Sequence, residues 1–188
     1  VMKILTYAYS EIQYQALTEL KFTHSNALAC DLNNINIELP PLPNGITIKP
    51  VGPEYDDVVF DHWQKMWIEN GVTTFHPNAK EMTFNFLNEA RKKFNYRTTA
   101  AFDGDKIVGS ASNNIFFGVE PCKKAGGAWA VYVHPEYRRH GIGTRLTVEM
   151  EKYFKELGCS QIRLIYASDN GRRIYERKTK QNQNSEAS

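Results

Sequence analysis

Short apolar runs and longer helical patterns divide the middle of the chain into strands and helices. Alternating or continuous short apolar runs predict strands over residues 46–49, 98–102, 107–116, 128–133 and 161–167. Apolar residues three or four positions apart predict helices over residues 53–70, 78–94 and 141–157. The last three elements form a strand, helix and strand, and a unit of this length is expected to pair its two strands in parallel.

The first two helices are predicted to turn an apolar face inward. Gly71 is placed to end the first helix, and Asn78 with Glu81 three residues later resembles a capping box that begins the second. The residues expected to face inward are Val59, Trp63, Met66 and Trp67 on the first helix, and Met82, Phe86, Leu87, Ala90 and Phe94 on the second.

A β-hairpin is predicted after the second helix, because residues 103–106 read Asp-Gly-Asp-Lys between two alternating runs. The second strand of this hairpin carries Ser110, Ser112 and Asn114, which are polar enough to keep one face beside a wet cleft. Residues 117–127 contain glycine and proline and are expected to form a loop.

The most informative stretch covers residues 131–146, where a strand meets a basic glycine turn and then a helix. Gly141 and Gly143 allow an anion to approach the backbone, and Arg138 and Arg139 add positive charge. The unpaired N–H groups and the dipole of the helix favour an anion at the same place. No Gly-Lys-Ser/Thr follows, as a P-loop requires, and the third glycine of a dinucleotide fingerprint is absent. A pyrophosphate would fit this stretch, and the alternative is a tight turn that only joins a strand to a helix.

Composition narrows the class of protein only slightly. The chain has 188 residues, 41% of them hydrophobic, which suffices for one domain with a real core. A net charge of +2 gives no polybasic signature of nucleic-acid or membrane binding. Cys30, Cys122 and Cys159 lack metal-ligand spacing, so we expect no metal site and a reducing, cytoplasmic compartment. No apolar run reaches the roughly 20 residues that span a bilayer, and no convincing signal peptide is present.

The two ends of the chain are expected to lie outside the main domain. Residues 1–44 are interpreted as an extension and linker, with strand character at residues 2–9 and a proline-rich segment near the end. Residues 178–188 form a polar tail that is predicted to be disordered. The domain is predicted to cover residues 45–177.

The glycine turn resembles the acetyl-CoA motif of the GNAT superfamily of N-acetyltransferases. That motif reads Arg or Gln, two residues, Gly, one residue, then Gly or Ala, and residues 138–143 read Arg-Arg-His-Gly-Ile-Gly after Val-His-Pro-Glu-Tyr. The resemblance covers about residues 46–177, without the family's usual C-terminal strands. It implies an α/β fold with a mixed, mostly antiparallel central sheet flanked by helices, and one parallel pair splayed at the acetyl-CoA site. Residues 2–9 or a second protomer of a homodimer would then supply the missing strand.

Acetyl-CoA is the co-substrate that the resemblance implies, with no metal. The central strand would pair its backbone with the pantetheine arm, the glycine turn would hold the pyrophosphate, and either Ser168 or Asn170 would bind the pantetheine after the last strand. The implied contact residues are Val131, Tyr132, Val133, Arg138, Arg139, His140, Gly141, Ile142, Gly143, Thr144, Ser168 and Asn170.

The resemblance also implies direct attack of a primary amine on the thioester. Tyr175 falls where the family has a tyrosine that protonates the leaving thiolate, and a phenol with a pKa of about 10 suits a general acid. The alternative role for Tyr175 is to pack a helix against the sheet.

The general base is not indicated by the family's pattern. Many members carry a glutamate on the central strand, but the corresponding positions here are Ala128, Trp129 and Ala130. The amine would then be deprotonated through a water chain, by His134 or by an acid from another strand. Glu120, in the loop 117–127, is either a base acting through water or a surface residue.

The expected acceptor is a small-molecule or peptide amine. In the family, the two helices after the first strand form one wall of the acceptor site. Asp56, Asp57 and Asp61 either attract a cationic amine there or complement a helix N-terminus and a solvated face.

Two functions of other classes are also considered. One is an acyl-CoA-binding module without turnover, such as a truncated or inactive homologue. The other is a nucleic-acid-binding domain, against which the near-neutral charge argues, and we expect neither nucleic-acid nor membrane partners. Its contacts would be Arg138, Arg139, Arg163, Arg172 and Arg173.

Overall fold

The structure, a computed structural model, describes residues 27–32, 41–117 and 124–165. Six strands, three α-helices and two short 3₁₀ helices lie in these ranges. In chain order they are β1 (Ala27–Asp31), β2 (Ile46–Val51), η2 (Pro53–Tyr55), α2 (Asp56–Glu69), α3 (Ala79–Lys93), β3 (Arg97–Asp103), β4 (Lys106–Phe117), β5 (Lys124–Val133), η3 (Pro135–Tyr137), α4 (Ile142–Glu156) and β6 (Gln161–Ile165).

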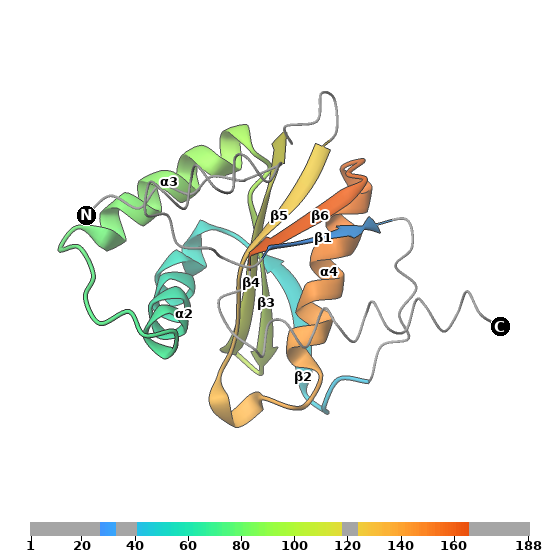
Figure 1. The fold of residues 1–188 in the computed structure, drawn as a ribbon. Coiled ribbons are helices and arrows are strands. Elements are labelled where there is room, and N and C mark those ends of the chain that lie inside the picture. Colours follow the sequence, from blue (N-terminus) through green and yellow to red (C-terminus); the bar gives the residue numbers. More distant parts are fainter. Residues whose placement is uncertain (1–26, 33–40, 118–123, 166–188) are drawn as a thin grey trace.

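All six strands form one mixed sheet in the order β1-β6-β5-β4-β3-β2. Neighbouring strands are antiparallel except for β5 and β6, which are parallel. Helices α2 and α3 lie on one side of this sheet and α4 on the other (Figure 1). The predicted mixed, mostly antiparallel sheet with one parallel pair is therefore confirmed.

Strand β1 covers the outer edge of β6, with Ala27 opposite Ile165 and Asp31 opposite Gln161. This edge is occupied by part of the predicted N-terminal extension, so residues 1–44 are not wholly separate from the sheet. Residues 2–9, expected to supply such a strand, lie outside the described ranges. The boundary at residue 45 stays a prediction.

The hairpin is confirmed, with Asp103 paired to Lys106 and Gly104 at a φ of 57°. The expected loop over residues 117–127 is wrong at both ends, because β4 extends to Phe117 and β5 begins at Lys124. Gly126, one of the residues that suggested a loop, lies inside β5 and is buried there against α4.

Helix α4 and the sheet enclose most of the core. One cluster contains Ile142 and Leu146 near the helix start, and a second contains Met150 and Phe154 near its end. Gly158, at a φ of 73°, ends the helix as predicted.

The inward faces predicted for α2 and α3 are only partly correct. Val59, Leu87 and Ala90 are buried, whereas four of the expected inward residues are exposed. These are Trp67, Met82, Phe86 and Phe94. The capping box is also wrong, since the Asn78 side chain makes no capping hydrogen bond. Large apolar side chains therefore remain on the surface of this side of the molecule.

Gly126 offers a test of the packing between β5 and α4. A Cβ atom at this position would overlap the ring of Phe154, which is fully buried. We expect Gly126→Ala to lower the free energy of unfolding by about 2 kcal/mol, measured by urea denaturation, because a packed core resists an added carbon. In a Phe154→Leu background the same substitution should cost less, since the ring is gone. Equal stability of Gly126→Ala and wild type would contradict the described packing.

Candidate active site

The glycine turn leads into the N-terminus of α4 as the sequence predicts. Gly141 caps the helix at a φ of 79°, a left-handed conformation that favours glycine, and Arg139 has a φ of 69°. The first N–H groups of α4, at Ile142, Gly143 and Thr144, have no partner within the helix, because intrahelical bonding begins with Arg145 N–H to Gly141 O at 2.9 Å. The turn is shaped to receive an anion.

Arg138 is held by contacts on the protein itself. Its Nε donates to Val133 O at 2.7 Å, and its guanidinium meets both carboxylate oxygens of Glu69 on α2 at 2.7 and 2.9 Å. These contacts, with Nη2 alone donating to both oxygens of Glu69, fix the turn to the end of β5 and to α2. Arg139 and His140, by contrast, have exposed side chains. Because Arg138 is already paired with Glu69, the positive charge that would attract an anion comes from Arg139 and the helix N-terminus rather than from Arg138 alone.

Strands β5 and β6 pair in parallel over the first part of β5, and β6 is described to Ile165. Their parallel register ends at Ala128 and Leu164, although β5 continues to Val133. The register of β4 on β5 shifts at the same level, where Ser112 faces Ala130 and Asn113 faces Ala128. Trp129 is therefore the extra residue of a β-bulge. The bulge lies at the end of the described parallel pairing, where the sequence predicts a splayed site, and the splay itself stays a prediction.

The side chains beyond the bulge alternate between the two faces of the sheet. Val131 and Val133 pack against the cluster under α4, and Tyr132 turns toward α2 and is buried. The backbone of these three residues lies where β5 has no described β6 partner. An extended strand that leads into a glycine-lined helix N-terminus fits an extended chain ending in a pyrophosphate, so the residues present fit acetyl-CoA.

A buried histidine, which sequence reasoning missed, packs on Tyr132. His62 of α2 is only 4% exposed, its Nδ1 lies 2.9 Å from Ser110 Oγ, and its ring centroid is 4.7 Å from that of Tyr132. Burial, helped by the charge of Lys65, lowers the pKa of His62 to about 4. The imidazole is therefore neutral at pH 7. Burial of His62 could have been inferred from its position three residues after Val59, because the two side chains then share one face of α2.

This histidine predicts a loss of stability in mild acid. Between pH 6.5 and 4 the unfolded chain binds a proton at His62 and the native state does not, so stability falls as the pH falls through that range. We expect the free energy of unfolding to drop by about 2 kcal/mol from this source between pH 7.5 and 5. His62→Gln should lose this component, and His76→Gln, at an exposed histidine, should retain it. The same pH slope in His62→Gln and wild type would contradict the assignment.

The polar residues of β4 do not line a wet cleft, contrary to the expectation. Ser110, Ser112 and Asn114 are all buried. Their hydroxyl and amide groups form hydrogen bonds inside the protein. Ser110 bonds with His62, Ser112 bonds with Thr98 at 3.3 Å, and Asn114 accepts from the indole N–H of Trp129. These side chains of β4 therefore hold His62, Thr98 and Trp129 in place.

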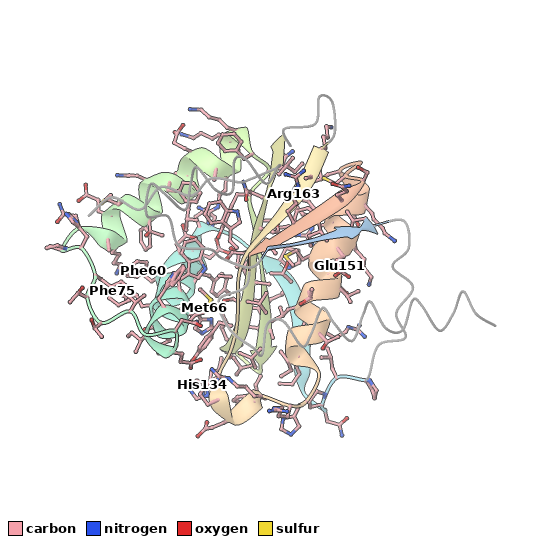
Figure 2. The ribbon with its side chains drawn as sticks, in the orientation of Figure 1. Phe60, Met66, Phe75, His134, Glu151 and Arg163 are labelled. Carbon is pink, nitrogen blue, oxygen red and sulfur yellow. The ribbon has the colours of Figure 1, made fainter. Side chains whose placement is uncertain are left out.

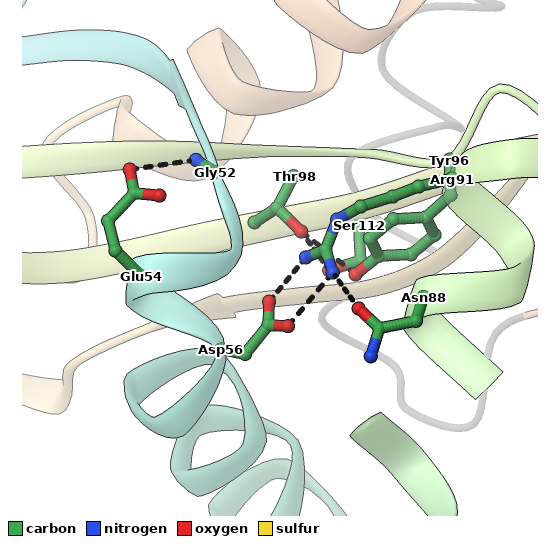
Figure 3. A network of polar contacts seen from close by, with 8 residues as sticks. All are labelled: Gly52, Glu54, Asp56, Asn88, Arg91, Tyr96, Thr98 and Ser112. Carbon is green, nitrogen blue, oxygen red and sulfur yellow. Dashed lines mark hydrogen bonds and ion pairs between the residues drawn. The ribbon is translucent and has the colours of Figure 1, made fainter. Parts of the chain in front are cut away.

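The acidic residues of α2 are engaged in ion pairs. Asp56 is buried and receives both guanidinium nitrogens of Arg91 from α3, beside Tyr96 and Thr98 (Figure 3). The remaining pairs are Asp57 with Lys80, Asp61 with Lys65 at 2.6 Å, and Glu69 with Arg138. These carboxylates tie the helices to each other and to the turn, so the alternative that Asp56, Asp57 and Asp61 attract a cationic amine loses support.

Candidate bases are few in the described ranges. The strands described carry only two acidic residues, Asp31 and Asp103, each at a strand end, and Asp103 accepts a hydrogen bond from Tyr137 at 2.7 Å. His134 follows β5 and is half-buried, with Nδ1 3.7 Å from Glu136 Oε2. Figure 2 shows its place at the end of β5, with Met66 on the α2 side. An acid from another strand is thus not supported here.

Several predicted site residues fall outside the described ranges. They are Glu120, Ser168, Asn170, Arg172, Arg173 and Tyr175, and their roles stay predictions. Where the structure does describe the chain, no three His, Cys, Asp or Glu side chains are grouped to hold a metal. No helix within those ranges is long and apolar enough to cross a bilayer.

Comparison with known proteins connects this geometry to one family. The model of the acetyltransferase (GNAT) family matches residues 58–178, more than half of the chain. An acetyltransferase of Photorhabdus laumondii is 36% identical over 70 residues, which are 37% of this chain and 48% of that protein. The chain therefore matches about half the length of that relative.

Solved structures share the fold at low sequence identity. A predicted acetyltransferase from Clostridium acetobutylicum, solved with acetyl-CoA, is 20% identical with a TM-score of 0.62, and the match covers 70% of this chain and 87% of that one. An N-acetyltransferase from Ralstonia eutropha is 22% identical with a TM-score of 0.61, covering 71% and 90%. An aminoglycoside acetyltransferase from an uncultured soil sample, in complex with sisomicin, is 15% identical with a TM-score of 0.59, covering 72% and 88%.

Proposed function

The chain belongs to the GNAT family of acetyltransferases, and we propose that it transfers an acetyl group from acetyl-CoA to a primary amine. The observation that supports this most is the continuity of β5 with the glycine turn: a strand that runs on to Val133 beyond its described parallel register, Gly141 at a φ of 79°, and the N-terminus of α4. The 20%-identical neighbour solved with acetyl-CoA has the same fold.

The proposed binding roles follow from these positions. The N–H groups of Ile142, Gly143 and Thr144, with the exposed Arg139, would hold the pyrophosphate. The backbone of residues 131–133 would pair with the pantetheine arm and polarise the thioester carbonyl. Ser168 or Asn170 would close the other side of the arm. Arg138 positions the turn through Val133 and Glu69.

Acetyl-CoA supplies an activated thioester. In the transfer, the C–S bond of the thioester breaks and a C–N bond to the amine forms. We propose that the Tyr175 hydroxyl donates the proton that the departing sulfur needs, because a phenol stays protonated at neutral pH. The amine proton would leave through water or to His134, since the described strands offer no carboxylate away from their ends. Positioning and backbone hydrogen bonding would supply most of the rate enhancement.

The test combines a calorimetric titration of the chain with acetyl-CoA and an assay of thiol release over a panel of amines. Stoichiometric binding and amine-dependent thiol release are the expected results. Binding without turnover on any amine would favour an acyl-CoA-binding module, and absence of binding would reject the proposal.

A further inference from the structure

Two aromatic rings stand exposed beside the bulge of β5. Trp129, the bulged residue, is 50% exposed, and Phe86 of α3 is 37% exposed, with the ring centroids 5.4 Å apart and the planes tilted by 48°. Met82, one helical turn before Phe86, is 60% exposed on the same face of α3. An exposed tryptophan and phenylalanine in contact form a surface on which a third ring can stack.

The orientation of Trp129 is fixed by its neighbour on β4. Its indole N–H donates to Asn114 Oδ1, and Asn114 Nδ2 in turn donates to Ile115 O at 3.1 Å. Asn114 is only 6% exposed, so this anchor is shielded from solvent. Phe86 contacts the ring from α3, an element independent of the sheet. A ring held in this way loses little conformational freedom on binding a ligand.

The ring pair lies at the point where the two substrates of the proposed reaction would meet. Trp129 directly follows Ala128, the last residue of β5 in register with β6. About 13 Å of extended strand separates it from Val133 at the end of β5. Helices α2 and α3 lie on the side of the sheet opposite α4 (Figure 1), and Trp129 contacts Phe86 of α3 on that side. A ligand stacked there would reach the splayed strands from the face opposite α4.

Charge on this side disfavours a polycationic acceptor. All four acidic side chains of α2, including Asp57 and Asp61, are paired with lysine or arginine, and Glu89 of α3 pairs with Lys92 and Lys93. Glu81 of α3 is the one acidic side chain of these two helices without an ion pair, and a single free carboxylate does not make a site for several ammonium groups. The exposed rings offer an apolar, planar surface instead.

From these observations, and resting on the proposed acetyltransferase function, we propose that Phe86 and Trp129 form an acceptor subsite that selects amines carrying an aromatic ring. The ring of the acceptor stacks on this pair, and its amine reaches past the bulge toward the thioester. Phe86 and Trp129 take no part in proton transfer, so their replacement acts on acceptor selection and leaves acetyl-CoA binding unchanged.

The test compares three amines as substrates of the full chain: 2-phenylethylamine, hexylamine and spermidine. We expect kcat/KM for 2-phenylethylamine to exceed the other two by about tenfold, the size of one good aromatic contact. Phe86→Ala and Trp129→Leu should each remove most of this preference, whereas Trp67→Leu, at a tryptophan of α2 that is 43% exposed, should keep it. Phe86 lies on a helix surface where alanine is well tolerated, so this variant remains informative if Trp129→Leu fails to fold.

A second readout does not depend on turnover. Calorimetry of 2-phenylethylamine with the chain saturated by CoA should show binding that weakens about tenfold in Phe86→Ala. Preference for hexylamine or spermidine, or an aromatic preference that survives both substitutions, would overturn the subsite. If acetyl-CoA binds but no amine is acetylated, the proposed function fails. The calorimetric result then decides the subsite alone: binding that is lost in Phe86→Ala supports it, and absence of binding overturns it.

Discussion

Replacing Gly141 with valine is expected to weaken acetyl-CoA binding about a hundredfold, equivalent to about 2.8 kcal/mol. Gly141 has a φ of 79° at the cap of α4, where a β-branched residue is strained. Relief of that strain would turn the peptide groups that precede α4 away from the ligand, and the added side chain would fill the space through which a phosphate approaches. Calorimetric titration with acetyl-CoA measures the effect.

The matched control for this substitution is Gly104→Val. Gly104 also has a positive φ, 57°, but lies in the β3–β4 hairpin with no atom within 4 Å of an added Cβ. The Gly104→Val variant should be less stable because of the same backbone strain, and it should bind acetyl-CoA with the wild-type affinity. Equal affinities in Gly141→Val and Gly104→Val would show that the turn does not bind the co-substrate.

Tyr175→Phe is expected to lower kcat by about a hundredfold, within the range for loss of a general acid. The substitution removes only the hydroxyl, so the affinity for acetyl-CoA should stay the same. Steady-state kinetics with a reactive amine, together with calorimetry, separates the two effects.

Tyr153→Phe provides the control for Tyr175→Phe. The Tyr153 hydroxyl donates to Asn95 O at 3.2 Å, on α4 and away from the turn, so kcat should be unchanged. A Tyr175→Phe enzyme with undiminished kcat would assign Tyr175 to packing, and another group or water would then protonate the thiolate.

The parts of the fold set by neighbouring residues were predictable from sequence. The Asp103–Lys106 hairpin, the glycine that ends α4 and the parallel pairing of β5 with β6 all follow from local turn chemistry or element length. The pairing of Ala27–Asp31 with β6 did not follow, because it joins segments more than a hundred residues apart and no local pattern specifies it.

The site was predicted less completely, for physical reasons. The glycine turn is a local motif, so Gly141 was found by reading the sequence alone. Helical periodicity placed Phe86 inside, but it does not reveal that Trp129 bulges outward to meet it. Ion pairs such as Asp56 with Arg91 join different helices and are invisible to spacing. Residue spacing does not give the charge state of His62, because burial of the side chain is what lowers its pKa.

The most direct test of acetyl transfer is a single-turnover reaction with acetyl-CoA labelled in the acetyl group, followed by mass spectrometry of the amine and of CoA. Transfer predicts that the label appears on the amine nitrogen as free CoA forms in equal amount. Label that remains on CoA, or that appears only as free acetate, would contradict the proposed function.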